Sequence, residues 1–154
     1  MTLRPLRRED LDISFAFVSG LSPETRYNRL LGGVRAITRE YIESLVTIDD
    51  SREMAVAATA MRDGGETLIG VSRYVRDNGS AEFALVVADA WQGRGIGRRL
   101  LAKLIEVARR RGLKRLYGDI LAMNRPMLGL VRALGFTLGR HEDPTLTRAS
   151  LDLR

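Results

Sequence analysis

Apolar side chains recur every three or four residues in five stretches of the chain, a spacing typical of a helix with one buried face. The longest stretch runs from Gly93 to about Arg111, and Gly112 is its expected stop. The apolar stripe of this stretch consists of Ile96, Leu100, Leu101, Leu104, Ile105 and Ala108. Two further stretches run from Arg8 to about Gly20 and from Ser22 to Gly32-Gly33. The last two run from Thr38 to beyond Leu45 and from Asn124 to Ala133. In the first two of these, the apolar positions are Leu11, Phe15, Val18, Tyr27, Leu30 and Leu31.

Between these stretches lie short apolar runs bounded by turn residues, which predict strands. The runs are 2–7, 54–61, 67–76, 82–87, 114–121, a short segment around 137–138, and 146–153. Asp63-Gly64-Gly65 and Asp77-Asn78-Gly79 are typical of hairpin turns. The predicted order is β-α-α-α-β-β-β-α-β-α-β-β. It fits an α/β (α+β) fold with a central mixed, mostly antiparallel sheet flanked by helices, formed by a single domain over residues 1–154.

Composition removes several classes of function. The 154 residues include no cysteine, which excludes disulfides, thiolate metal sites and a cysteinyl acyl-enzyme. A single histidine, His141, with scattered acids predicts no metal site. No apolar run approaches the ~18 residues of a membrane helix, and the N-terminus lacks an apolar signal core, so we expect a cytoplasmic protein without membrane contact.

The formal net charge is +6, and only two of the 25 basic residues are lysines. The excess favours an anionic ligand or an acidic partner. The high ratio of arginine to lysine is better explained by an arginine-rich genome composition than by such a ligand or partner. Because the basic residues are dispersed and aromatics make up 6% of the chain, we expect no nucleic-acid partner.

The most informative segment is the loop Gln92-Gly93-Arg94-Gly95-Ile96-Gly97, which joins an apolar strand to the longest predicted helix. Its three glycines allow unusual backbone angles and keep side chains out of the approach path. Backbone amides at a helix start, together with the helix dipole, favour an anionic group. The segment therefore predicts a pyrophosphate cradle. It lacks the G-K-[ST] of a Walker loop and the G-x-G-x-x-G of a Rossmann fingerprint.

The spacing Gln92-x-x-Gly95-x-Gly97 after a strand resembles the acetyl-CoA motif of the GNAT superfamily of N-acetyltransferases, and so does Asn124 at a helix start with Gly135-Phe136 at the helix end. The resemblance implies a GNAT-like fold and acetyl-CoA as co-substrate. It implies that backbone amides of the strand, the glycine loop with the start of its helix, and Asn124 contact the cofactor. The residues implied are Leu85, Val86, Val87, Gln92, Gly93, Arg94, Gly95, Ile96, Gly97, Arg98 and Asn124. Asn124 is alternatively a plain helix cap, and Arg94 and Arg98 are alternatively solvated surface arginines.

Three further patches resemble the acetyltransferase domain of bacterial Pat-type protein lysine acetyltransferases: 21–27, 52–55 and 81–83. With the two motifs, the resemblance covers roughly residues 1–137. It implies that Glu82 is the general base, and we expect Glu82 to be partly buried. The alternative is an exposed strand-edge carboxylate, with Glu53 and Asp50 as reserve bases. Where many superfamily members carry a tyrosine that protonates the leaving thiolate, this chain has Val131, and Tyr117 is expected in the core.

The sequence thus predicts an N-acetyltransferase that moves acetyl directly from acetyl-CoA to an acceptor amine in a ternary complex. Protein lysine is the expected acceptor, because the segment from Leu11 to Thr47 lacks the acid cluster that a small amine would need. The alternatives are a small amine such as a polyamine, amino acid or antibiotic, and a CoA-binding module without catalysis. Strands at the C-terminus make a homodimer possible.

Overall fold

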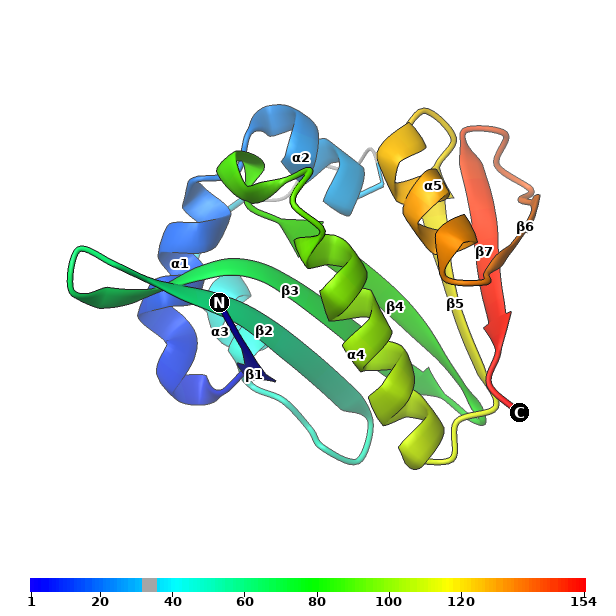
Figure 1. Cartoon of the computed structure of the whole chain (residues 1–154), viewed down its shortest axis with the longest axis horizontal. Helices are drawn as coiled ribbons and strands as arrows, with labels where there is room; N and C mark the ends of the chain where they lie inside the picture. Colours follow the sequence, from blue (N-terminus) through cyan, green and yellow to red (C-terminus); the bar gives the residue numbers. More distant parts are fainter. Residues whose placement is uncertain (32–35) are drawn as a thin grey trace.

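The computed structural model describes residues 1–31 and 36–154 (Figure 1). In these residues one sheet has the strand order β1-β2-β3-β4-β5-β7-β6. The strands are β1 (Thr2–Pro5), β2 (Glu53–Arg62), β3 (Gly65–Asp77), β4 (Ser80–Val87), β5 (Arg115–Leu121), β6 (Thr137–Arg140) and β7 (Leu146–Asp152). The α-helices are α1 (Leu11–Ser19), α2 (Pro23–Arg29), α3 (Arg39–Val46), α4 (Ile96–Arg110) and α5 (Arg125–Ala133). The predicted element order is confirmed, with short 3-10 helices η1 (Arg8–Asp10) and η2 (Asp89–Trp91) added.

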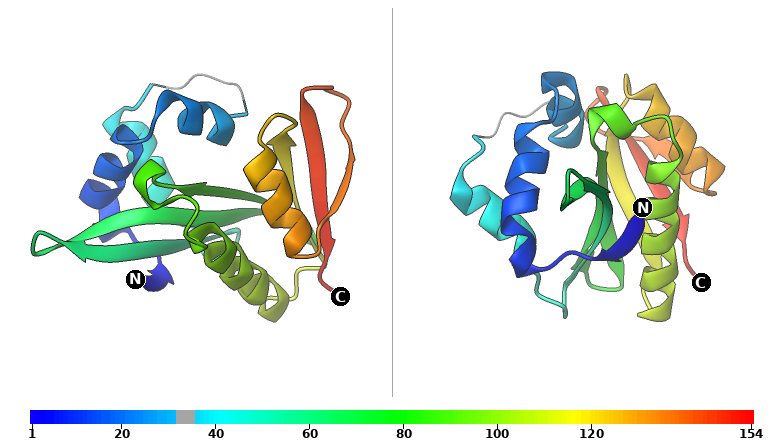
Figure 2. Two further views of the ribbon diagram at one scale, coloured as in Figure 1. Left: turned by 45° about the horizontal axis from the view of Figure 1, so that its top comes forward. Right: turned by 60° about the vertical axis from the view of Figure 1, so that its left-hand side comes forward.

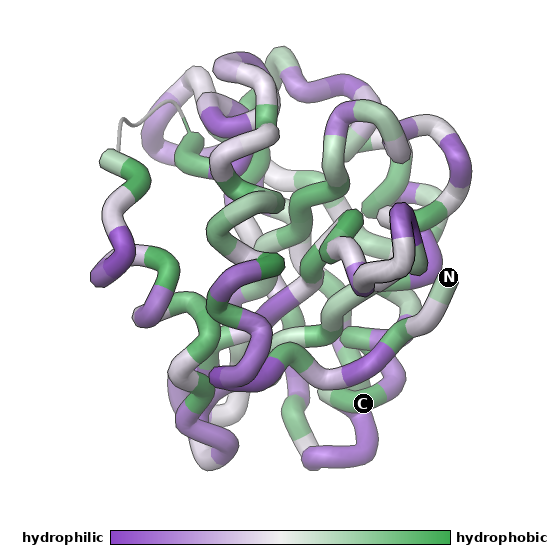
Figure 3. The backbone as a smooth tube through the Cα atoms, turned by 90° about the vertical axis from the view of Figure 1, so that its left-hand side faces the viewer, coloured by the Kyte–Doolittle hydropathy of each residue, from purple (hydrophilic) through white to green (hydrophobic). Residues whose placement is uncertain are grey.

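Helices cover both faces of the sheet, α1 and α3 on one side and α4 and α5 on the other (Figure 2). The larger apolar cluster lies under α4 and α5, and all six residues of the predicted α4 stripe belong to it. The smaller cluster lies under α1 and includes Phe17, Val46 and Val71. Hydrophobic residues concentrate along the inner strands and helix faces, and hydrophilic residues concentrate at the periphery (Figure 3).

The faces predicted for the first two helices were partly wrong. In α1, Phe17 is buried while Phe15 is 40% exposed. In α2, Tyr27 is 47% exposed, and Leu31 just after the helix is 39% exposed. Tyr27 and Leu31 instead line a large cavity, so their apolar spacing does not mark a packed face. The predicted end of this helix at Gly32-Gly33 lies outside the described residues.

Strands β4 and β5 form the single parallel pair of the described sheet, and they pair over three residues only. Ser80, Ala81 and Glu82 lie opposite Arg115, Leu116 and Tyr117. Strand β4 continues to pair with β3 as far as Val87, whereas its pairing with β5 stops at Glu82. The sheet therefore opens between β4 and β5 at the end nearer α2 and α5 (Figure 1).

The N–H and C=O groups of β4 point alternately to β3 and to β5, because successive residues of a strand point these groups to opposite neighbours. Ala88 N donates to Ile69 O on β3 at 2.8 Å, so the even-numbered residues of β4 face β3. Lys114 N donates to Gly79 O at 2.8 Å, so the odd-numbered residues face β5. Beyond Glu82, the N–H groups of Leu85 and Val87 consequently point into the opening, and those of Val86 point to β3.

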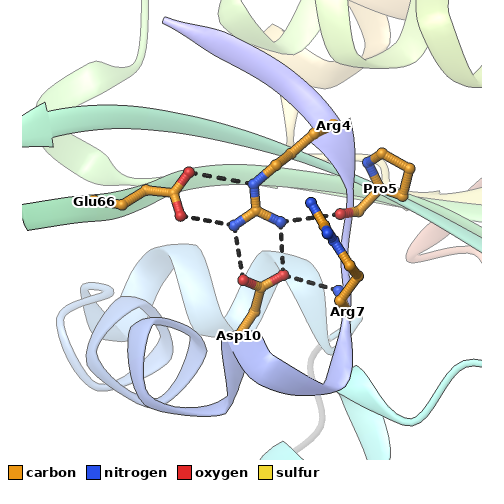
Figure 4. Close-up of polar contacts among 5 residues, drawn as sticks. All are labelled: Arg4, Pro5, Arg7, Asp10 and Glu66. Carbon is orange, nitrogen blue, oxygen red and sulfur yellow. Dashed lines mark hydrogen bonds and ion pairs between the residues drawn. The ribbon is translucent and has the colours of Figure 1, made fainter.

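The N-terminal strand is fixed by the guanidinium of Arg4, which bridges two carboxylates (Figure 4). Its Nη1 and Nη2 donate to the Asp10 carboxylate at 2.8 and 2.7 Å, and its Nε and Nη2 donate to Glu66 at 3.2 and 2.8 Å. Arg7 N adds a donor to Asp10 Oδ2 at 2.8 Å. Hydrogen bonds from Arg4 outweigh burial and hold the pKa of the Asp10 carboxyl below its usual value. The cluster ties β1 to η1 and β3.

Candidate active site

A cavity of about 550 Å³ lies where the sheet opens. Helix α2, strand β4, the loop before α4 and the start of α5 surround it. All the site residues predicted from the sequence line it except Arg94, so residues from separate elements come together: Glu82, Leu85, Val86, Val87, Gln92, Gly93, Gly95, Ile96, Gly97, Arg98 and Asn124. Its size falls within the usual range for small-molecule sites.

The glycine loop has the backbone conformation that its sequence requires. Gly93 and Gly95 have φ values of 76° and 80°, in the left-handed region that other residues rarely adopt. Gly95 is the N-cap of α4, and no side chain caps this helix. The first amides of α4 therefore remain available beside the cavity, at the positive end of a 15-residue helix. This arrangement fits the pyrophosphate of CoA.

Gln92 holds the loop in place by hydrogen bonds to protein groups. Its Nε2 donates to Val87 O at 3.0 Å and to Thr25 Oγ1 at 3.3 Å. It thereby joins the end of β4, the loop and α2. The Gln92 amide therefore helps to fix the shape of the cavity wall.

Asp89 ties α2 to the same loop, and the sequence analysis missed it. Its carboxylate accepts from Ser22 N at 2.9 Å, Ser22 Oγ at 2.7 Å and Thr25 Oγ1 at 2.8 Å. Burial would raise its pKa, but the hydrogen bonds from Ser22 and Thr25 hold the pKa of the Asp89 carboxyl below its ordinary value. The sequence signal for Asp89 was the position of an acid between the predicted strand 82–87 and the glycine loop.

Arg94 lies outside the cavity lining, and its guanidinium stacks over the ring of Trp91 at 4.9 Å from the centroid. Arg62 approaches the same ring at 5.7 Å. Trp91 itself lines the cavity. The Arg94 side chain therefore packs against the cavity wall from outside.

Glu82 is the last residue of β4 that pairs with β5, so it stands where the strands begin to separate. It lines the cavity and is exposed, so the predicted partial burial was wrong. The reserve acids lie elsewhere, because Glu53 accepts from Asp49 N at 3.1 Å, and neither Glu53 nor Asp50 lines the cavity.

The α5 side of the cavity supplies a cap and a second carboxylate. Asn124 Oδ1 accepts from Met127 N at 3.4 Å, so Asn124 caps α5 and also lines the cavity. Val131 is fully buried and offers no proton donor. Asp119, which the sequence analysis missed, lines the cavity and is already paired with Arg148 and with His141, the latter at 3.3 Å. Tyr117 is half-buried, and its hydroxyl lies 3.3 Å from an Asp77 carboxylate oxygen.

Residues 1–31 and 36–154 lack two further features. No group of three or more histidine, cysteine, aspartate or glutamate side chains is placed to hold a metal ion there. No helix in that part of the chain is long and apolar enough to cross a membrane.

Known proteins resemble this chain over most of its length. Residues 22–136 match the Acetyltransferase (GNAT) family. Acetyltransferase PA5475 of Pseudomonas aeruginosa is 38% identical over 143 residues, which cover 92% of this chain and 77% of that protein. The L-methionine sulfoximine/L-methionine sulfone acetyltransferase of P. aeruginosa is 35% identical over 147 residues, which cover 82% and 86%. The crystal structure of the GNAT domain of S. lividans PAT superposes with a TM-score of 0.87 at 26% identity, covering 97% of this chain and 89% of that one.

Proposed function

The chain belongs to the GNAT family of acetyltransferases, and from this we propose that it transfers an acetyl group directly from acetyl-CoA to the ε-amine of protein lysines. The observation that carries this proposal is the position of Glu82. Its exposed carboxylate lies at the edge of a cavity that continues to the glycine loop. An amine on a bulky folded substrate can reach such a carboxylate from outside. The resemblance of residues 21–27, 52–55 and 81–83 to Pat-type protein lysine acetyltransferases supports the same acceptor.

Glu82 would remove the proton that blocks the reaction. Only about 0.1% or less of free lysine amines are neutral at pH 7, because their pKa is near ~10.4. A carboxylate within direct or one-water reach accepts a proton from the amine, so that the nitrogen lone pair is available to attack.

The backbone of β4 and the glycine loop would hold the other reactant. Acetyl-CoA supplies a thioester carbonyl when bound. The N–H groups of Leu85 and Val87 point into the opening, where they can donate to an oxygen that gains negative charge. As nitrogen bonds to the carbonyl carbon, the carbon–sulfur bond breaks. The thiolate then takes a proton from water, since Val131 supplies none.

The test is release of CoA thiol from acetyl-CoA with lysine peptides, folded proteins and small amines as acceptors. We expect turnover on protein lysines. Glu82→Gln should lower kcat/KM by about 10²–10⁴ while leaving the KM for acetyl-CoA unchanged, because glutamine is isosteric but cannot accept the proton. Asp50→Asn is the matched control, since it removes an exposed acid outside the cavity.

Two results would contradict this assignment. Glu82→Gln turning over at the wild-type rate would remove Glu82 as base and favour a CoA-binding role. Turnover confined to small amines would exclude protein lysine as the acceptor.

A small amine is the second candidate, because a partly enclosed apolar pocket with three arginines, Arg26, Arg29 and Arg73, adjoins Glu82's cavity. The 35% identical P. aeruginosa relative named for methionine sulfoximine and methionine sulfone supports it. Both named compounds are amino acids, and each carries a carboxylate beside its amine.

A further inference from the structure

A second cavity of about 60 Å³ lies beside the first, on the α1 and α3 side of the sheet. Three residues line both cavities, namely Arg29, Ala84 and Val86, so the two spaces meet at the end of α2 and the middle of β4. The rest of its lining is mostly apolar and includes Leu30, Leu45 and Val71. A cavity needs about 10–15 Å³ to hold one water molecule, so this space has room for roughly four heavy atoms.

Arg29 carries a charge that the protein does not neutralise. It is the last residue of α2, and no hydrogen bond or ion pair reaches its guanidinium from any residue in 1–31 or 36–154. Burial lowers the pKa of the Arg29 guanidinium, and electrostatic interactions with Tyr41 and Glu82 act in the opposite direction but are smaller. Arg29 is half-buried, and a positive charge that is partly removed from water and has no acidic partner attracts an anion.

Arg73 adds a second positive charge to the same wall. It lies on β3 opposite Ala84, and its Nη2 donates to Leu45 O at 2.7 Å. Burial, followed by the nearby charge of Arg29, lowers the pKa of Arg73 to about 10. Arg26 also lines the pocket, where its Nη2 donates to Ser19 O at 2.7 Å, so three guanidinium groups make the site strongly positive.

This positive site lies close to the proposed base. Arg73 is diagonal to Glu82 on one face of the sheet, because Ala84 pairs with Arg73 and Glu82 pairs with Val75. Glu82 is near enough for its charge to act on Arg29, yet the two form no ion pair. A ligand can therefore place an amine at Glu82 and an anion at Arg29.

We propose that Arg29, with Arg73 behind it, binds a carboxylate carried by the acceptor, and that the apolar lining around Ala84 and Val86 takes the acceptor's apolar group. This rests on the proposed acetyl transfer at Glu82. The carboxylate can come from a free amino acid or from an acidic residue next to a lysine in a peptide. The chemistry recognised is the same in both cases.

The direct test measures binding without turnover. N-acetyl-L-leucine and N-acetyl-L-leucinamide are titrated calorimetrically into the wild type in the presence of CoA. We expect the carboxylate form to bind at least about tenfold more tightly, since hydrogen bonds between charged groups exceed the ~1.4 kcal/mol of a tenfold change. Arg29→Met should abolish this preference, and Arg29→Lys should retain part of it. Arg109→Met, at the exposed end of α4, should retain all of it. Equal binding of the two probes, binding of neither, or no effect of Arg29→Met would overturn the proposal.

Turnover separates the two sources and tests the underlying reaction. Leucine is compared with leucinamide, and a lysine peptide with glutamate beside the lysine is compared with its glutamine counterpart. A lower KM for one carboxylate member of a pair supports the proposal and identifies the source. Thiol release with equal KM values in both pairs would reject the carboxylate site while leaving acetyl transfer intact. Selective binding of N-acetyl-L-leucine without turnover on any amine would reject acetyl transfer and leave the site standing.

Discussion

Gly118 is a position where a single methyl group decides how the sheet packs. A Cβ there would lie 2.7 Å from Cε1 of Phe83, and the ring of Phe83 packs on that of Phe136 at 5.2 Å between centroids. The rings have no room to move away without disturbing the core. The glycine therefore allows the aromatic pair to lie directly over β5.

We expect Gly118→Ala to lower the free energy of unfolding by about 1–3 kcal/mol, because the extra carbon overpacks the core. Urea denaturation measures it. Gly129→Ala is the matched control. Gly129 lies inside α5 with open space at its Cβ position, so alanine there should raise stability by about 0.5–1 kcal/mol. A destabilised Gly129→Ala together with an unaffected Gly118→Ala would contradict this account.

At the residue scale the sequence identified the candidate base but not its surroundings. Glu82 could be named because a resemblance points to its position. Its exposure depends on which elements pack over that part of the sheet, and that is a tertiary property. Arg29 had no signal at all, since nothing local distinguishes it among so many arginines. Its isolation appears only when α2, β3 and β4 are brought together.

At the element scale, the attachment of β1 and η1 depends on the ionised form of Asp10. Its folded-state pKa lies below the ordinary value of 3.8, with hydrogen bonds from Arg4 as the main cause. The resulting stabilisation is present above about pH 4 and is lost as the pH falls through the depressed folded pKa. Acid should therefore weaken the N-terminal attachment.

We expect Asp10→Asn to lower the unfolding free energy at pH 7 by about 2 kcal/mol, because a charge-assisted network with Arg4 is lost. As the pH falls below about 4, the variant should lose less further stability than the wild type, because it no longer has this carboxyl to protonate. Denaturation at a series of pH values measures both effects. Parallel pH curves for the two proteins would exclude the Asp10 contribution.

Elements with strong local signals were predicted well. The α4 stripe is buried as expected, and Asn124 caps α5. The weakly patterned helices were predicted less well, since Tyr27 and Leu31 follow helical spacing yet border a cavity. Apolar periodicity identifies a helix face, but it does not distinguish a face that packs from one that lines a binding site.

At the scale of the whole molecule, the order of elements could be read from the sequence, but the opening of the sheet could not. Turn residues and periodicity separate the strands, and short connections limit how they pair. The opening arises because β4 and β5 share only three residue pairs. Nothing in the composition of either strand indicates where that pairing ends.

The alternating backbone of β4 has a consequence for amide hydrogen exchange. The N–H groups of Ala84 and Val86 are held by β3 and should exchange slowly in the free protein. Those of Leu85 and Val87 face the opening and should exchange quickly until CoA is added. Residue-resolved NMR exchange with and without CoA tests this, and uniform slowing along the strand would contradict it. Within one strand, the amides of Ala84 and Val86 would then report the integrity of the sheet, and those of Leu85 and Val87 would report occupancy of the cavity.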